Sequence, residues 1–154
     1  MNVLVRKATI NDLAIIQQLN DRLFELEIES FDPTLTPKWA LSEKGRAYFA
    51  DMIENGFVIV AEEGEDVIGY LAGRIGLKQF YQQGLRAELD NMFIDESYRG
   101  RGVGKNLINL FLKECKKEKV SSVRVTASAK NKNAIAFYEK IGFYKKDITL
   151  AIDL

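Results

Sequence analysis

A glycine-rich turn between a strand-like and a helix-like segment constrains the fold of this chain more than any other feature. Residues 86–94 follow the two-residue period of a strand, and residues 103–115 carry apolar side chains at helical spacing. A second strand-like segment follows at 120–127. Two strands joined by a crossover helix run parallel in one sheet. We therefore expect a strand–helix–strand unit with the glycine turn at the start of its helix.

The remaining segments predict a mixed α/β domain around that unit. Thr9 is expected to cap a first helix that ends near residue 29, and Pro37 to open a second that ends at Asn55. Further strands are expected at 2–8, 57–61, 66–76 and 143–154, and a short helix at 133–140. The order β-α-α-β-β-β-α-β-α-β, without repeats or linkers, predicts a single α/β domain over residues 1–154 with a mixed sheet.

Composition excludes several kinds of chemistry. The 154 residues contain no His and one Cys, which excludes a Ser–His–Asp or Cys–His nucleophile, most zinc sites and an internal disulfide. No uncharged apolar stretch approaches the roughly 18 residues of a membrane span, and no signal peptide is visible at the first residues. We expect a cytoplasmic protein that does not bind a membrane.

The charges are balanced in total but unevenly placed. Residues 1–98 hold 9 basic and 17 acidic side chains, whereas residues 99–154 hold 13 basic and 5 acidic ones. This asymmetry favours a cationic partner for the first part and phosphate for the second, although solvated surface charge explains it as well. Nucleic-acid binding through the basic half is a weaker alternative, because the acidic half opposes it.

The turn itself has the composition of an anion site. Three alternating glycines, Gly100, Gly102 and Gly104, let a ligand approach the backbone, and the N–H groups of a helix N-terminus attract phosphate. A nucleotide P-loop would require glycine at Arg99, and a dinucleotide fingerprint would require it at Lys105. Both alternatives are therefore weak.

Two motifs together resemble those of the GNAT superfamily of acetyl-CoA-dependent N-acetyltransferases. The first is Arg99-x-x-Gly102-x-Gly104 after a strand, and the second is Asn133-Ala-x-x-Phe137-Tyr138 followed by Gly142-Phe143. The resemblance covers essentially the whole chain, since the order of elements also agrees. It implies acetyl-CoA as co-substrate, direct attack by an amine in a ternary complex, no metal, and a homodimer as one arrangement found in the family.

The resemblance also implies a set of coenzyme contacts. The strand before the turn is expected to pair with the pantetheine arm, the turn to hold the pyrophosphate, and the second motif to contact the arm and the sulfur. These roles fall on Met92, Phe93, Ile94, Arg99, Gly100, Arg101, Gly102, Val103, Gly104, Lys105, Asn133 and Tyr138.

Candidate catalytic groups follow from the chemistry of amide formation. Tyr138 has a phenol that can protonate a leaving thiolate. In a regular strand, Glu88 and Asp90 share one face with Met92 and Ile94, and either carboxylate can take the proton of an ammonium group. Glu88 is the first choice for this base and Asp90 the second. Pairing of these carboxylates with Arg74 or Arg86 is an almost equally good interpretation.

The acceptor is predicted from the acidic end of the first helix. Glu25, Glu29 and Asp32 favour a cationic amine, such as a polyamine, an amino sugar or a lysine-like amine of a small molecule or protein. Each of them alone also fits a solvated helix surface. A non-catalytic acyl-CoA sensor on the same fold is the alternative function, and release of thiol with an amine distinguishes the two.

Overall fold

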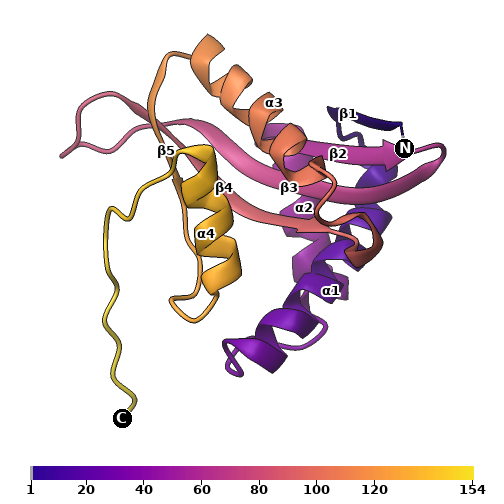
Figure 1. The fold of residues 1–154 in the computed structure, drawn as a ribbon, viewed down its shortest axis with the longest axis horizontal. Coiled ribbons are helices and arrows are strands. Elements are labelled where there is room, and N and C mark those ends of the chain that lie inside the picture. Colours follow the sequence, from indigo (N-terminus) through magenta and orange to yellow (C-terminus); the bar gives the residue numbers. More distant parts are fainter. Residues whose placement is uncertain (1) are drawn as a thin grey trace.

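The computed structural model describes residues 2–154 and shows a five-stranded sheet with helices on both faces (Figure 1). The strands lie in the order of the sequence: β1 (Val3–Lys7), β2 (Phe57–Glu63), β3 (Asp66–Leu77), β4 (Leu85–Ile94) and β5 (Val120–Val125). The first four are antiparallel to their neighbours, whereas β4 and β5 run parallel. The parallel pair is joined by α3 (Val103–Lys117), which confirms the expected crossover.

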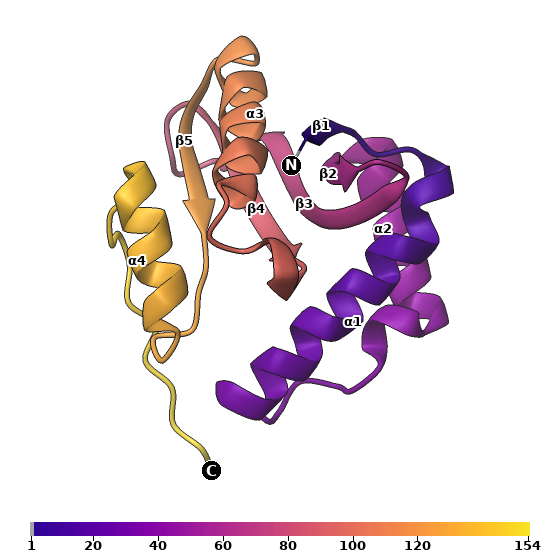
Figure 2. The same ribbon diagram turned by 45° about the vertical axis from the view of Figure 1, so that its right-hand side comes forward.

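The two faces of the sheet are covered by different helix pairs (Figure 2). The first face carries α1 (Leu13–Ser30) and α2 (Glu43–Asn55), and the second carries α3 and α4 (Lys132–Ile141). Along β3, Tyr70 packs with the first pair and Leu71 with the second, because successive side chains of a strand point to opposite faces. The sheet is therefore the middle of three layers.

Short 3-10 turns precede three of the helices: η1 (Ile10–Asp12), η2 (Trp39–Leu41) and η3 (Glu96–Tyr98). The expected opening of the second helix at Pro37 is wrong. Lys38 has a left-handed φ of 60°, which an α-helix does not allow, and α2 begins only after Ser42. The Ser42 hydroxyl accepts a 3.2 Å hydrogen bond from the Gly45 N–H, as an N-cap does. Thr9 is the N-cap of the 3-10 turn η1, where its N–H donates to Asp12, whereas α1 itself begins after Asp12.

The expected final strand at 143–154 is also wrong. We call these residues the tail; they follow Gly142, which ends α4, and extend without regular structure to the C-terminal residue (Figure 1). A strand is stable only when a neighbour satisfies its backbone groups. The tail instead forms an ion pair with β5, Arg124–Asp147 at 2.7 Å, and no sheet pairing within residues 2–154.

Candidate functional site

The two parallel strands separate halfway along β4. Their pairing runs from Leu85 and Val120 to Leu89 and Val125, while β4 continues to Ile94 with β3 as its neighbour. The edge of β4 that faces away from β3 is therefore open from Asp90 to Ile94. Backbone N–H and C=O groups on an open strand edge can pair with an extended ligand. Met92, Phe93 and Ile94, expected to contact an extended arm, lie on this open edge.

A β-bulge coincides with the point of separation. On β3, Ala72 and Gly73 are adjacent, but their partners on β4 are Asn91 and Leu89, so Asp90 is an extra residue. Because a bulge shifts the alternation of side chains, the faces reverse there. The expected common face for Glu88, Asp90, Met92 and Ile94 is wrong: Met92 and Ile94 pack toward α3 and α4, on the same face as Ala87 and Leu89.

The glycine turn follows directly after the open edge. Gly100 and Gly102 have φ values of 73° and 82°, a region in which other residues are strained, and no atom lies within 4 Å of the place where a Cβ would stand. Gly102 precedes the first residue of α3 and offers no capping side chain. The first-turn N–H groups of α3, on Val103, Gly104 and Lys105, lack partners within the helix by its geometry. The turn is an open concave backbone surface at the positive end of a helix.

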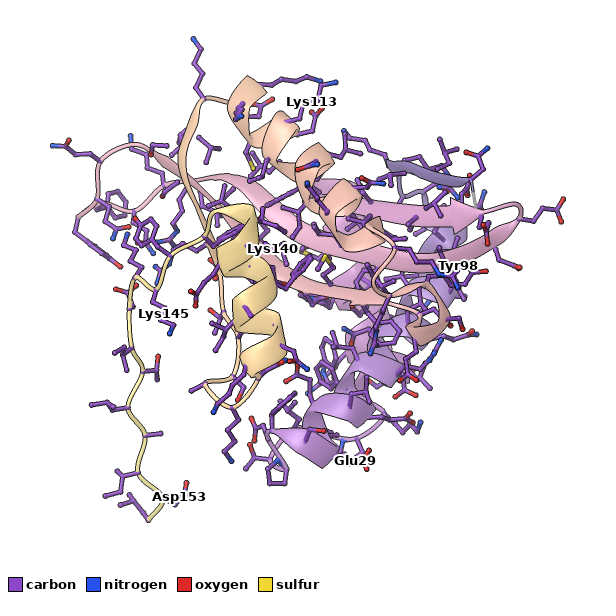
Figure 3. All side chains as sticks on the ribbon, viewed as in Figure 1. Glu29, Tyr98, Lys113, Lys140, Lys145 and Asp153 are labelled. Atoms are coloured by element: carbon purple, nitrogen blue, oxygen red, sulfur yellow. The ribbon has the colours of Figure 1, made fainter. Side chains whose placement is uncertain are left out.

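Cationic side chains surround this turn. The Arg99 guanidinium donates a 2.9 Å hydrogen bond to the Ile94 carbonyl and lies 5.2 Å from the centre of the Phe93 ring. Arg101 lies 5.7 Å from the ring of Tyr98, which is visible at the edge of the turn in Figure 3. These contacts hold positive charge next to the first turn of α3, an arrangement suited to a phosphate or pyrophosphate.

Gly104 has a different role from the other two glycines. A Cβ at this position would lie 3.1 Å from Cζ of Phe137 on α4 and 3.2 Å from Cδ1 of Ile94 on β4. Glycine therefore lets the first turn of α3 pack closely against both elements. This contact sets the distance between the turn and α4.

The second motif places Tyr138 on α4, half-buried against the sheet. Its ring packs edge-on against Phe137 and Phe143, with centroids 5.4 and 5.5 Å apart. Burial, with a smaller contribution from the negative charge of Glu27, raises the pKa of Tyr138 to about 12. The phenol is therefore protonated at neutral pH and able to donate a proton. Asn133 is exposed in the first turn of α4, where Asn131 and not Asn133 caps the helix.

The carboxylates of β4 both have cationic neighbours. Asp90 lies 3.2 Å from Arg74, and Glu88 lies 3.9 Å from Arg86. The ion pairs that the sequence offered as an alternative to a catalytic role are therefore present. Asp90 is the more enclosed of the two, since its side chain is 17% exposed and that of Glu88 39%.

A hydrogen-bonded chain that the sequence did not predict connects Asp90 with the interior. The Tyr48 hydroxyl donates to Asp90 at 2.9 Å and accepts from the Asn91 amide at 3.2 Å. The Asn91 carbonyl oxygen accepts from Tyr70 at 2.6 Å, and the Tyr70 hydroxyl accepts from Asn20 at 2.7 Å. Burial and the charge of Asp90 raise the pKa of Tyr48 to about 12. No sequence motif marks these residues, because the hydrogen bonds between them depend on the bulge in β4.

The acidic end of α1 divides into two faces. Glu25 pairs with Lys38 at 2.7 Å and, with Glu29, lines a pocket of about 250 Å³ beside Lys38. Glu27 lies roughly 200° around the helix from Glu25, because each residue turns it by about 100°. On this side of α1, the negative charge of Glu27 acts on Tyr138 of α4.

Glu27 is a candidate for the base that the sequence analysis did not propose in that role. Burial, and then repulsion from Asp32, raise the pKa of its carboxyl group. Asp32 accepts hydrogen bonds from Thr34 in the loop after α1, and a weaker attraction links it to Lys130 before α4. The end of α1 therefore faces the start of α4. A regular four-residue spacing of acids favoured Glu25 and Glu29, whereas it is the negative charge of Glu27 that acts on Tyr138.

A family model described as "Acetyltransferase (GNAT) family" matches residues 20–143, which include the open edge of β4, the glycine turn and Tyr138. The chain belongs to the GNAT acetyltransferase family. This confirms the predicted family and its α/β fold, and GNAT enzymes use acetyl-CoA as their acyl donor.

Curated GNAT relatives share part of their length with this chain. An uncharacterised N-acetyltransferase of Methanocaldococcus jannaschii is 32% identical over 72% of this chain and 48% of its own length. Mycothiol acetyltransferase of Corynebacterium glutamicum is 29% identical over 68% of this chain and 34% of its own length. The chain thus spans half or less of the curated relatives it matches.

Solved structures share the fold along their whole length. The aminoglycoside N-acetyltransferase AAC(6')-Iy in complex with CoA superposes with a TM-score of 0.79 at 15% identity, covering 99% of this chain and 95% of that one. A transcriptional regulator from Bacillus halodurans superposes with a TM-score of 0.78 at 22% identity, covering 99% and 100%. At these identities the likeness concerns the GNAT fold.

Two further features are absent from residues 2–154. No helix within residues 2–154 has the length and apolar character needed to cross a membrane. No group of three or more potential metal-ligating side chains occurs in the part of the chain that the structure describes.

Proposed function

We propose that this chain transfers the acetyl group of acetyl-CoA to a primary amine, and that the acceptor is a small cationic amine. The observation that carries this proposal is the opening between β4 and β5, which begins after Leu89 and leads directly to the glycine turn. An extended arm along the open edge and a pyrophosphate at the turn would use adjacent backbone groups. Family membership supports the same donor.

The residues present fit acetyl-CoA, which supplies its acetyl group as a thioester. Gly100 and Gly102 leave space where side chains would stand, and Arg99, Arg101 and Lys105 add positive charge. Met92, Phe93 and Ile94 lie on the open part of β4, where the Ile94 carbonyl accepts a hydrogen bond from Arg99, and Asn133 offers an exposed amide at the start of α4. Val103 and Gly104 complete the first turn of α3 with their N–H groups.

The proposed reaction requires two proton transfers. The neutral amine nitrogen attacks the thioester carbonyl carbon, a C–N bond forms and the C–S bond breaks. N–H groups at the bulge of β4 stabilise the negative charge that develops on the carbonyl oxygen. Tyr138 donates its phenolic proton to the leaving sulfur, as its protonated state at neutral pH allows.

The second proton leaves the amine. Three carboxylates are candidates for its acceptor: Glu27, Glu88 and Asp90. Glu27 is favoured by its electrostatic contact with Tyr138 and by a pKa raised through burial, because a raised pKa makes a carboxylate a better base. Asp90 and Glu88 instead lie within ion-pair distance of Arg74 and Arg86.

The acidic groups at the end of α1 support a cationic acceptor. Glu25, Glu27, Glu29 and Asp32 lie within one helix end and the loop that follows it. Two solved neighbours of the same fold are aminoglycoside acetyltransferases, and aminoglycosides carry several protonated amines. We therefore extend the acceptor class to polyamines, amino sugars and lysine-like amines.

An amine screen tests the proposal. The protein is incubated with acetyl-CoA and polyamines, amino sugars, aminoglycosides or a lysine peptide, and free thiol and product mass are measured against a control without amine. We expect thiol release and an acetylated product with at least one cationic amine, and loss of both in Tyr138→Phe. Coenzyme binding without turnover of any amine would overturn the catalytic proposal in favour of an acyl-CoA sensor.

A further inference from the structure

One side chain of α1 reaches the start of the glycine turn. The Arg22 guanidinium donates a 2.8 Å hydrogen bond to Asp95, the residue between β4 and η3. The guanidinium carbon of Arg22 lies 5.2 Å from the centre of the Phe93 ring, and that of Arg99 lies at the same distance from this ring. Arg22 therefore lies beside the place where the open edge of β4 passes into the turn.

Asp95 is the junction between the two parts of the proposed coenzyme site. Its N–H donates to the Ile68 carbonyl on β3 at 2.8 Å, and its own carbonyl accepts from the Tyr98 N–H at 2.9 Å. One carboxylate oxygen accepts from the N–H and the hydroxyl of Ser97, each at 2.9 Å, and the other accepts from Arg22. The backbone that enters the turn is thus held by β3 and η3, and Arg22 adds a link to α1.

The ion pair between Arg22 and Asp95 is present at neutral pH. The Arg22 guanidinium, followed by the Ser97 hydrogen bonds, lowers the pKa of Asp95 to about 2, so the carboxylate is charged. The Arg22 side chain is 43% exposed and that of Asp95 is 26% exposed. Ion pairs that are accessible to water add little to the stability of a whole fold. We therefore expect this pair to act locally, on the position of the turn.

We propose that Arg22 is a positioning residue for the pyrophosphate of the coenzyme, an inference that rests on the proposed function. Arg22 acts through Asp95 and does not contact the phosphates: the ion pair fixes the start of the segment that carries Gly100 and Gly102. N–H groups bind an anion most tightly when they are held in place before it arrives, because ordering them on binding costs free energy. Without the pair, the turn moves relative to α1 and coenzyme binding weakens.

Calorimetry with CoA tests this role without requiring turnover. We expect Arg22→Gln to weaken CoA binding about fivefold, as for the loss of one partly exposed ion pair. Arg22→Lys should bind CoA more tightly than Arg22→Gln, because a single nitrogen of Arg22 bonds Asp95 and lysine can supply one. Arg46→Gln, which changes an exposed arginine of α2, is the matched control and should not alter the affinity.

The two ways in which this experiment can fail are distinguishable. A wild type that does not bind CoA would contradict the proposed function itself. A wild type that binds CoA, together with an unchanged affinity in Arg22→Gln, would overturn only the role of Arg22.

Asp95→Asn separates positioning from a direct or long-range charge effect. This variant keeps an oxygen for Ser97 but loses the ion pair, and it changes the charge near the turn in the opposite direction to Arg22→Gln. In a positioning role both variants bind CoA more weakly, and the double variant binds about as well as either single one. Tighter binding by Asp95→Asn, or a further loss on adding Arg22→Gln to it, would overturn the proposal.

A donor without the pyrophosphate separates positioning from general support of the fold. S-acetylpantetheine has the arm and thioester of acetyl-CoA but no pyrophosphate. Arg22→Gln should raise the KM for acetyl-CoA with kcat nearly unchanged, and should leave kcat/KM for S-acetylpantetheine close to that of the wild type. An equal loss with both donors would show that Arg22 supports the fold and not the turn, which would overturn the proposal.

Discussion

The Tyr48 hydroxyl donates a 2.9 Å hydrogen bond to Asp90, the extra residue in the bulge of β4. The same Asp90 oxygen lies 3.2 Å from an Arg74 nitrogen, and Asn91 donates to Tyr48 at 3.2 Å. Side chains from α2 and β3 thus hold the bulge where ladder hydrogen bonds are interrupted. The bulge in turn reverses the faces of β4 just before its open edge, so Tyr48 links the packing of α2 to the shape of the site.

Tyr48→Phe should destabilise the protein by about 1–2 kcal/mol, because it leaves Asp90 and the Asn91 amide without this partner in a partly buried place. Urea unfolding measures the change. Tyr144→Phe is the matched control: Tyr144 is 77% exposed and its hydroxyl removal should alter stability by less than about 0.5 kcal/mol. Equal stability of the two variants would show that the hydrogen bond does not hold the bulge.

Tyr138→Phe should lower kcat about 10²-fold, as expected for loss of a general acid, with the KM for acetyl-CoA nearly unchanged. The ring contacts with Phe137 and Phe143 remain in this variant, so its unfolding midpoint should stay close to that of the wild type. Because the pKa of Tyr138 is raised to about 12, its loss of a proton should not appear in the neutral part of the pH–rate profile. An unchanged kcat would remove Tyr138 from the reaction.

Gly102→Ala should weaken coenzyme binding about tenfold, which corresponds to about 1.4 kcal/mol. Its φ of 82° is strained for alanine, and relief of this strain would move the N–H groups of the turn. Gly64→Ala is the matched control, since Gly64 has a φ of 64° in the β2–β3 turn and also has open space around it. Both variants should lose similar stability on unfolding. Calorimetry with CoA should separate them, and equal affinities would contradict a phosphate site at this turn.

The glycine turn and the crossover could be predicted because their signals are local. Three glycines after a strand, followed by Val103, Leu107 and Phe111 at helical spacing, specify a turn, a helix and its buried face without any distant contact. The cap at Thr9 is local in the same sense. The family resemblance added the coenzyme roles to these elements.

Other features depend on contacts between distant residues and could not be read from the sequence. The bulge at Asp90 arises from the register of β4 against β3, and Tyr48 supports it from α2, 42 residues away along the chain. The tail also shows that a local pattern alone does not determine structure. Its alternation of Ile148, Leu150 and Ile152 predicts a strand, but forming one requires a neighbouring strand, and none within residues 2–154 pairs with it.

The pH dependence of the reaction should report on the carboxyl group of Glu27. The pKa of its carboxyl group is raised by burial and by the charge of Asp32. If Glu27 accepts the amine proton, activity requires its charged form, so the acidic limb of the kcat profile lies above the ordinary glutamate pKa. Asp32→Asn removes the repulsion but keeps an oxygen for Thr34, and should shift that limb to lower pH.

Glu27→Gln should abolish the acidic limb and lower kcat by about 10²-fold or more, as for loss of a general base. Glu118→Gln is the control, since Glu118 is exposed at the C-terminal end of α3, the end away from the glycine turn. The same substitution bears on stability: a carboxyl group whose pKa is raised on folding destabilises the folded state once it is charged. Glu27→Gln should therefore unfold at a higher midpoint than the wild type at neutral pH. This difference between variant and wild type should be smaller at acid pH, where Glu27 is protonated. If the acidic limb does not shift in Asp32→Asn and Glu27→Gln keeps full activity, Glu27 is not the base. The proton that leaves the amine would then go to Asp90 or Glu88.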